Sequence, residues 1–282
     1  MIIDTHTHFG DPEQPQALLY RTALPATYKA LAIPAGVTGT VVVETARHIE
    51  DNQWVLDQAA NDPFIVGLVG NLDPFADDFA PNLERFAANP LFKGFRLHSS
   101  CCRPYTGNPL QPAGEIAPRL RASLELLVAR DLTLDFHGDH TTLGYAAELT
   151  RQVPGLRLVL NHIAAGRPIN GRAPNPQWAR CLCEIAAQTT AYCKISALVQ
   201  MTETTPVPTE VEFYRPTLDV VWNAFGAERV IYASNWPQIE RFSDFATAHR
   251  IVARYFESKG SKAEEQFFWK NSQNAYRWAA RK

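Results

Sequence analysis

Short runs of β-branched and aliphatic residues alternate with longer segments of helical periodicity along the chain. Apolar runs such as Val41-Val42-Val43 and Leu158-Val159-Leu160 are typical of strands that are buried on both faces of a parallel sheet. Strands that alternate with helices predict βαβ units. The expected strands are residues 2–8, 39–44, 64–68, 94–98, 133–137, 157–162, 192–196 and 230–234.

The segments between these strands show helical signals. Residues 118–130, for example, have Pro118 near the expected start, and Leu120, Leu124 and Leu127 follow at helical spacing. We expect helices at residues 49–60, 82–88, 118–130, 142–152, 176–188, 215–225, 242–259 and 263–280. This alternation predicts an α/β fold of the (β/α)8 TIM-barrel type, with residues 1–282 forming one domain.

Composition and charge narrow the class of protein. The length of 282 residues is close to the roughly 250 residues of a typical barrel of this type. A net charge of -2 gives no reason to expect nucleic acid or a membrane surface as a partner. The five cysteines form no C-x-x-C pair, so we interpret them as reduced thiols of a cytoplasmic protein.

The first expected strand contains a candidate metal-binding motif, Asp4-Thr5-His6-Thr7-His8. Alternate residues of a strand face the same way, so His6 and His8 should point together into the barrel. Two imidazoles placed in this way can bind one divalent metal ion. The alternative is a pair of histidines on a solvated strand.

Two further histidines favour the metal interpretation. His137 ends the fifth expected strand and His162 ends the sixth, and both precede loops. Active sites of TIM barrels lie at the carboxyl ends of the strands. We therefore expect His6, His8, His137 and His162 to surround one site there.

Six motifs, spread from the first residues to the last, resemble the amidohydrolase superfamily, in its branch of lactonases and decarboxylases. They are Ile3-Asp4-Thr5-His6-Thr7-His8, Phe92-Lys93-Gly94-Phe95-Arg96, Leu160-Asn161-His162, Lys194-Ile195-Ser196, Ala233-Ser234-Asn235-Trp236-Pro237 and Asn274-Ala275-Tyr276-Arg277. The resemblance implies a metal, often zinc, among the four histidines. It is closest to sugar lactonases and pyrone dicarboxylate lactonases, some of which work without metal, so the expected cofactor is one divalent ion or none.

One position departs from the family pattern. The resemblance implies an Asp at the end of strand eight that binds the metal or takes a proton from water, and Asn235 stands there. A neutral amide cannot accept that proton, and it brings no negative charge to a metal. Three explanations stay open: a substitution made to trap substrate, a natural divergence that moved the base elsewhere, or a pseudoenzyme.

The expected substrate-binding residues lie on the same face of the barrel. Arginines can bind a carboxylate in bidentate fashion, and the alternative for each is a solvated loop charge. Glu44 could hold a sugar hydroxyl or be structural, and Lys194 could pair with Glu44 or Asp135 or simply pack. The full set of expected substrate-binding residues is Arg96, Arg103, Arg167, Arg172, Glu44 and His98.

The favoured hypothesis is hydrolysis of a sugar lactone or dicarboxylate lactone, with Asn235, His162 and His137 at the reacting centre. The metal, or a histidine alone, would polarise the carbonyl group. One alternative is a metal-dependent decarboxylase of an unsaturated or aromatic acid, and another is a barrel that binds a small acid without catalysis. The expected partner is a small molecule, and an exposed helix face could pair two copies of the chain.

Overall fold

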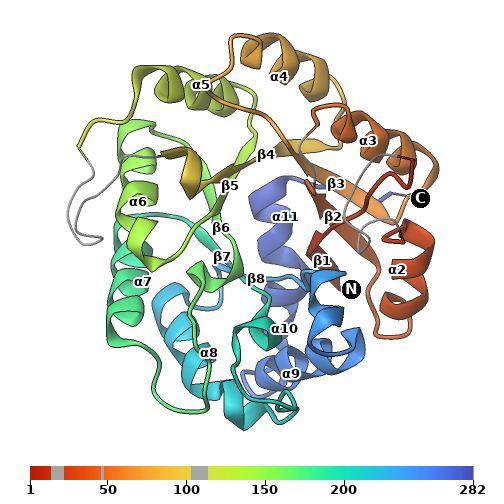
Figure 1. Cartoon of the computed structure of the whole chain (residues 1–282), viewed down its shortest axis with the longest axis vertical. Coiled ribbons are helices and arrows are strands. Elements are labelled where there is room, and N and C mark those ends of the chain that lie inside the picture. The colour runs from red at the N-terminus through yellow and green to blue at the C-terminus, as the bar shows by residue number, and fades with distance from the viewer. Residues whose placement is uncertain (14–21, 46–47, 103–113, 282) are drawn as a thin grey trace.

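The computed structural model describes residues 1–13, 22–45, 48–102 and 114–281. Its centre is a sheet of eight parallel strands in sequential order, surrounded by helices (Figure 1). The strands are β1 (Ile3–Thr7), β2 (Gly39–Val43), β3 (Ile65–Gly70), β4 (Phe92–His98), β5 (Thr133–His137), β6 (Arg157–Leu160), β7 (Tyr192–Ile195) and β8 (Val230–Tyr232). The predicted (β/α)8 barrel is confirmed, and each expected strand corresponds to an observed one.

The segment after β8 returns to β1 and completes the ring. His8 N donates to Trp236 O at 2.8 Å, and Asn235 N donates to His6 O at 2.8 Å. These two backbone hydrogen bonds lie beside a parallel bridge between Thr7 and Trp236. Ring closure therefore brings Asn235 next to the two histidines of the first motif, although more than two hundred residues separate them.

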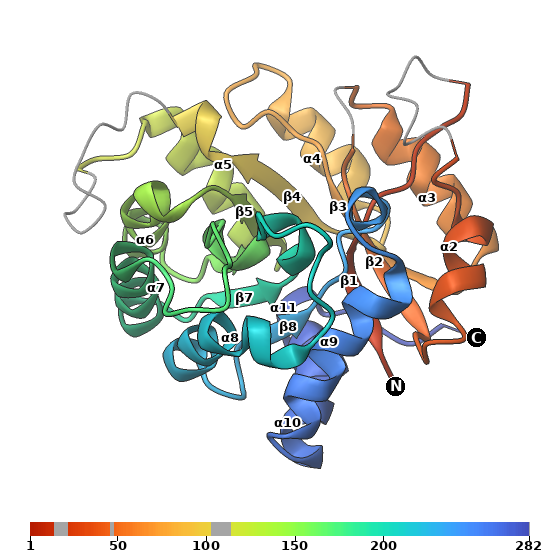
Figure 2. The same ribbon diagram turned by 60° about the horizontal axis from the view of Figure 1, so that its bottom comes forward.

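Helices cover the outside of the sheet (Figure 2). They are α2 (Pro25–Ala32), α3 (Asp51–Asn61), α4 (Phe79–Ala87), α5 (Pro118–Ala129), α6 (Leu143–Gln152), α7 (Pro176–Gln188), α8 (Val211–Phe225), α9 (Phe245–Glu257), α10 (Ser261–Glu265) and α11 (Asn271–Tyr276). None of the helices that the structure describes is long and apolar enough to cross a membrane.

The observed helices differ from the predicted ones in two places. Helix α2 was not expected, because its eight residues bury only Pro25, Tyr28 and Ala32 and so show a weak apolar pattern. The long helix expected at residues 263–280 is instead divided into α10, a π-helical turn at Gln266–Lys270 and α11, and it ends where Arg277 takes a left-handed conformation.

The interior of the barrel is filled by aliphatic side chains from the strands and closed by the C-terminal segment. Tyr276 and Trp278 pack with a cluster of strand residues, namely Ile3, Val41, Val43, Val66, Val69, Val159 and Ile231. Farther along, Arg281 donates to the backbone oxygens of Ala59 and Ile65 at 2.6 and 2.9 Å. The described C-terminal residues therefore fill this end of the barrel, and the opposite end can hold a site.

Gly94 in β4 should not tolerate a side chain. Its φ is +143°, and a Cβ atom there would lie 1.8 Å from Thr133 O on the neighbouring strand. We expect Gly94→Ala to lower the free energy of unfolding by more than about 3 kcal/mol, measured by urea denaturation. Gly226→Ala is the matched control, because Gly226 also has a positive φ, of +66°, but open space around its Cβ position. Equal losses in the two variants would contradict this explanation.

Candidate active site

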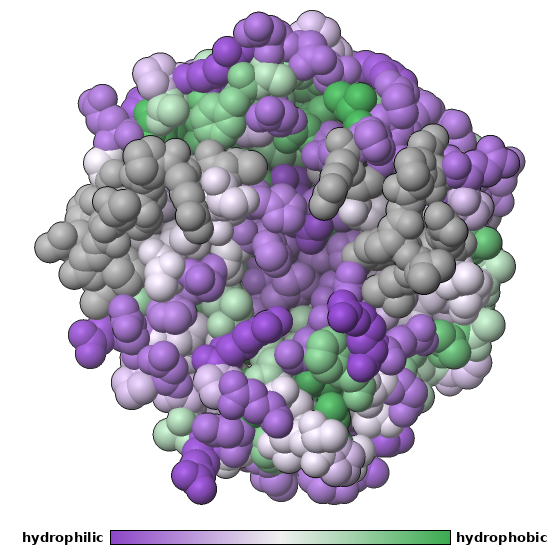
Figure 3. Space-filling model, viewed as in Figure 1, coloured by the Kyte–Doolittle hydropathy of each residue, from purple (hydrophilic) through white to green (hydrophobic). Residues whose placement is uncertain are grey.

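A polar cavity of about 440 Å³ opens at the carboxyl ends of the strands. Figure 3 shows a hollow with hydrophilic walls at the centre of this face. The lining includes seven residues expected from the sequence: His8, Arg96, His98, His137, His162, Arg167 and Asn235. A cavity of this size is typical of a small-molecule site.

The structure brings the four motif histidines together. The ring centroid of His6 lies 4.8 Å from that of His8 and 4.4 Å from that of His162, and His137 lies 5.5 Å from His162. His6 and His8 are almost fully buried, whereas His137 is the most exposed of the four. The histidines therefore form one continuous cluster at the base and wall of the cavity.

His8 and Asn235 are in direct contact. His8 Nε2 lies 3.1 Å from Asn235 Oδ1, and His8 Nδ1 lies 3.0 Å from Val43 O. Burial and the charge of Arg96 lower the pKa of His8 to about 4, so the ring is neutral at pH 7 and can donate to only one of these two oxygens. On its other side, Asn235 Nδ2 donates to Gln200 Oε1 at 2.6 Å. Gln200 was not expected from the sequence, because no motif marks the loop after β7.

His162 begins a stretch of unusual backbone. Residues 162–165 all have φ near +50°, including the β-branched Ile163 at +47°. Such conformations cost free energy and concentrate at functional sites. The turn places His162 Nδ1 at 2.8 Å from Ser196 Oγ, which fixes the orientation of the ring. Burial, followed by the charge of His137, lowers the pKa of His162 well below its ordinary value.

Arg96 and Glu44 form an ion pair in the cavity wall. Arg96 Nε donates to Glu44 Oε1 at 2.7 Å, Arg96 Nη2 donates to Glu44 O at 3.0 Å, and the same carboxylate lies 2.9 Å from His98 Nε2. The two charged side chains are only 9% and 8% exposed. Glu44 therefore largely balances the charge of Arg96 before any ligand binds, whereas the charge of a lone arginine would be unbalanced.

The other expected arginines differ in position. Arg167 lines the cavity. Arg172 lies exposed and outside the lining, and Arg103 lies outside the described residues. Ligand binding by any of these residues remains a prediction.

Acid should destabilise the fold through Glu44. Burial alone would raise the pKa of this carboxyl group, but Arg96 and His98 lower it to about 2, against 4.5 for an exposed glutamate. This stabilisation is complete above pH 4.5 and is lost as the pH falls toward 2. Urea denaturation should show a loss on the order of 3 kcal/mol in that window. Glu44→Gln should flatten this decrease in the free energy of unfolding. An equally steep decrease in that variant would contradict the assignment of the effect to Glu44.

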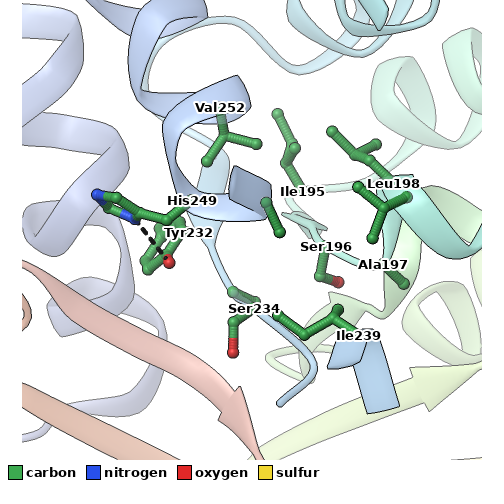
Figure 4. Close-up of a pocket in the computed structure, with 12 residues that line it drawn as sticks. Ile195, Ser196, Ala197, Leu198, Tyr232, Ser234, Ile239, His249 and Val252 are labelled. Carbon is green, nitrogen blue, oxygen red and sulfur yellow. Dashed lines mark hydrogen bonds between the residues drawn. The ribbon is translucent and has the colours of Figure 1, made fainter. Parts of the chain in front are cut away.

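A smaller cavity of about 20 Å³ lies behind the strands, between β7, β8 and α9 (Figure 4). It has room for about one water molecule and not for a substrate. His249 is half-buried beside it, and its Nδ1 lies 2.8 Å from Tyr232 Oη. Burial lowers the pKa of His249 to about 4, so this histidine is structural and neutral.

The four motif histidines, as they lie, do not fit a metal ion. Within the described parts of the chain, no group of three or more His, Cys, Asp or Glu side chains is placed to hold one. Arg96 Nη1 lies 3.3 Å from His6 Nε2, and Lys194 Nζ lies 3.4 Å from His6 Nδ1. Two cations beside one ligand oppose a dication, and Asn235 supplies no anionic ligand to offset them. A metal at these histidines stays a prediction, and no chemical step below depends on it.

Comparisons with known proteins agree with this fold. The family model described as amidohydrolase matches residues 3–278. L-Fucono-1,5-lactonase of Burkholderia ambifaria is 29% identical over 245 residues, which cover 83% of this chain and 80% of that protein. The chain therefore belongs to the amidohydrolase family. The family predicted from the motifs is confirmed.

Solved structures show how widely this fold is shared. An amidohydrolase from Burkholderia multivorans with bound zinc aligns with a TM-score of 0.82 and 19% identity, covering 99% of this chain and 100% of that one. A 2,6-dihydroxybenzoate decarboxylase from Rhizobium aligns with a TM-score of 0.64 and 14% identity, covering 98% of each. Metal binding and decarboxylation thus occur within the fold, and the fold alone does not select this chain's reaction.

Proposed function

We propose that this protein opens a sugar-type lactone by attack of water. The observation that carries the proposal is the balance of charges in the cavity. Arg96 is already paired with Glu44, and among the described lining residues Arg167 is the one cation without an ion-pair partner. A dicarboxylate lactone would need a cationic partner for each carboxylate. A neutral polyhydroxylated ring fits this balance better.

Neutral polar groups support the same substrate class. Gln200, Gln238, Asn161 and Ser99 all line the cavity and can exchange hydrogen bonds with hydroxyl groups. Such groups bind sugars without a net charge on either partner. The relative from Burkholderia ambifaria, which acts on a sugar lactone, supports this assignment as well.

In the proposed reaction Arg96 donates from Nη1 to the lactone carbonyl oxygen and stabilises the negative charge that develops there. Water attacks the carbonyl carbon and gives a proton to a neighbouring base, the ring C–O bond breaks, and the released alkoxide takes that proton back from the base. Asn235 can orient the water but cannot accept its proton. His162 and His137, which line the cavity and have low proton affinity, are the available acceptors.

The test is an assay of ring opening on a panel of aldonolactones and pyrone dicarboxylate lactones. We expect turnover with aldonolactones, and His162→Gln is the variant that should abolish it. Turnover restricted to the dicarboxylate lactones would contradict the substrate class. Release of carbon dioxide from an aromatic acid, with no lactone opened, would contradict the reaction.

Asn235 favours one second candidate, a barrel that binds a small acid without turning it over. Arg167 at the cavity would then be the group that holds the carboxylate. Calorimetry distinguishes the two candidates, because a binder shows saturable binding of a simple carboxylate and no heat from hydrolysis. If the second candidate holds, an Arg167→Gln variant should lose that binding. If the first candidate holds, the same variant should keep lactone turnover.

A further inference from the structure

The turn after β6 forms part of the cavity wall in an unusual backbone conformation. Residues 162–165 all have φ between +47° and +53°. His162 and Ala165 from this turn, and Arg167 just after it, line the cavity. Left-handed conformations are uncommon for residues other than glycine, and they persist only where surrounding contacts impose them. The contacts that hold this turn therefore determine where His162 and Arg167 lie.

Backbone hydrogen bonds attach the two ends of the turn to neighbouring parts of the barrel. At one end Asn161 N donates to Phe136 O at 2.9 Å, and at the other end Ile169 N donates to Met201 O at 2.8 Å. Between these points, the backbone hydrogen bonds of the described residues join the segment only to itself. The middle of the turn therefore depends on side chains for its attachment to the barrel.

The indole of Trp178 on α7 supplies this attachment. Its Nε1 donates to Ile163 O at 2.9 Å, and the side chain is 1% exposed. Trp178 lies in the first turn of α7, where the side chain of Asn175 caps the helix by accepting from the backbone N–H groups of Gln177 and Trp178. The indole thus extends from a fixed helix start and holds the turn through a directional bond.

Gly166 packs against the same indole. A Cβ atom at position 166 would lie 2.7 Å from Trp178 Cε2 and 2.8 Å from Trp178 Cζ2, closer than such atoms approach in proteins. Gly166 does not have a positive φ, so space and not backbone conformation requires glycine here. The hydrogen bond to Ile163 and the close approach of Gly166 therefore fix one rigid ring against two points of the turn.

We propose that Trp178 is a positioning residue of the active site, which holds the left-handed turn after β6 and so places His162 and Arg167 at the cavity. On the cavity side, His162 Nδ1 lies 2.8 Å from Ser196 Oγ, a contact that a shift of the turn would break. Without the indole, Ile163 O loses its buried donor and the segment can relax toward ordinary φ values. The kinetic consequence rests on the proposed function, whereas the order of the turn does not.

Hydrogen exchange tests the order of the turn without a substrate. In the full-length protein, Trp178→Phe should speed amide exchange in peptides that cover residues 161–167 by roughly tenfold, because local opening becomes easier. Trp278→Phe is the matched control, since the buried Trp278 also donates from Nε1, to Ser272 Oγ at 3.0 Å, at the closed end of the barrel. Unchanged exchange of the turn in Trp178→Phe, or an equal increase in the control, would overturn the proposal.

Gly166→Ala disturbs the same contact from the other side. Its methyl group would meet the indole, so exchange of residues 161–167 should rise as it does in Trp178→Phe. This variant keeps the proposal testable if Trp178→Phe does not fold. The two changes affect one contact, so the double variant Gly166→Ala/Trp178→Phe should exchange no faster than the more affected single variant. Fully additive effects would show that the two residues act independently and would overturn the proposal.

Activity gives the final comparison. With an aldonolactone as substrate, and at a temperature where all variants are folded, Trp178→Phe should lower kcat roughly tenfold with little change in KM, since a misplaced group impairs the reaction more than binding. Trp278→Phe should leave both parameters close to those of the parent. A change in KM alone in Trp178→Phe would overturn the proposal. Absence of turnover in the parent protein would instead count against the proposed function, and hydrogen exchange would still decide the role of Trp178.

Discussion

Replacing Asn235 by Asp should raise the rate of lactone opening by about 10²–10⁴-fold, the usual contribution of a general base. The carboxylate would take the position of the amide, 3.1 Å from His8 Nε2 and beside Gln200. There it can accept the proton of the attacking water, which the amide cannot do. The measurement is kcat/KM with an aldonolactone for the parent and the variant.

The backbone at position 235 accepts this change. Asn235 has φ of +67°, a left-handed conformation that Asn and Asp adopt more readily than most residues. The two side chains also have nearly the same shape, so the contacts with the neighbouring strand and with Trp236 should persist. An increase in rate would therefore report the charge and not a rearranged site.

A second acidic variant separates the position of the charge from its presence. Gln238→Glu adds the same negative charge to the same cavity at another lining residue. We expect it to raise kcat/KM far less than Asn235→Asp does, because its carboxylate does not lie beside His8 in the position of the amide. If both variants gain equally, the effect is a general electrostatic one. If Asn235→Asp opens no lactone of the panel, the lactonase proposal fails.

The sequence predicts the barrel well because its strands are buried on both faces. Runs such as Val41-Val42-Val43 are typical of strands buried on both faces, and their number and order define the sheet. The same logic predicts that the histidines lie together, because residues at the carboxyl ends of parallel strands meet at one edge of the sheet. Local pattern and global fold agree at these positions.

The parts that could not be predicted depend on contacts between distant loops or on weak patterns. Gln200 meets Asn235 only after the loops following β7 and β8 fold together, and no spacing in the sequence records that contact. The partner of Lys194 stayed open between Glu44 and Asp135 because both face the interior of the barrel. The structure selects Asp135, since Arg96 already pairs with Glu44.

Removal of Lys194 alone should be among the most damaging single changes to stability. Lys194 and Asp135 are both 0% exposed, so Lys194→Met would leave a carboxylate without its counter-ion in the interior. Breaking a buried pair in this way costs about 3–5 kcal/mol. We expect a loss of that size in the free energy of unfolding, measured by urea denaturation at pH 7.

The double variant shows whether the loss comes from the stranded charge. In Lys194→Met/Asp135→Asn both charges are gone. Tyr276 can still donate to the oxygen of the new amide, and the NH2 group of that amide can donate to Oδ1 of a rotated Asn161 side chain. Replacement of both partners of a buried pair is often neutral, so the double variant should be more stable than Lys194→Met. If it is equally or less stable, the ion pair itself contributes to stability.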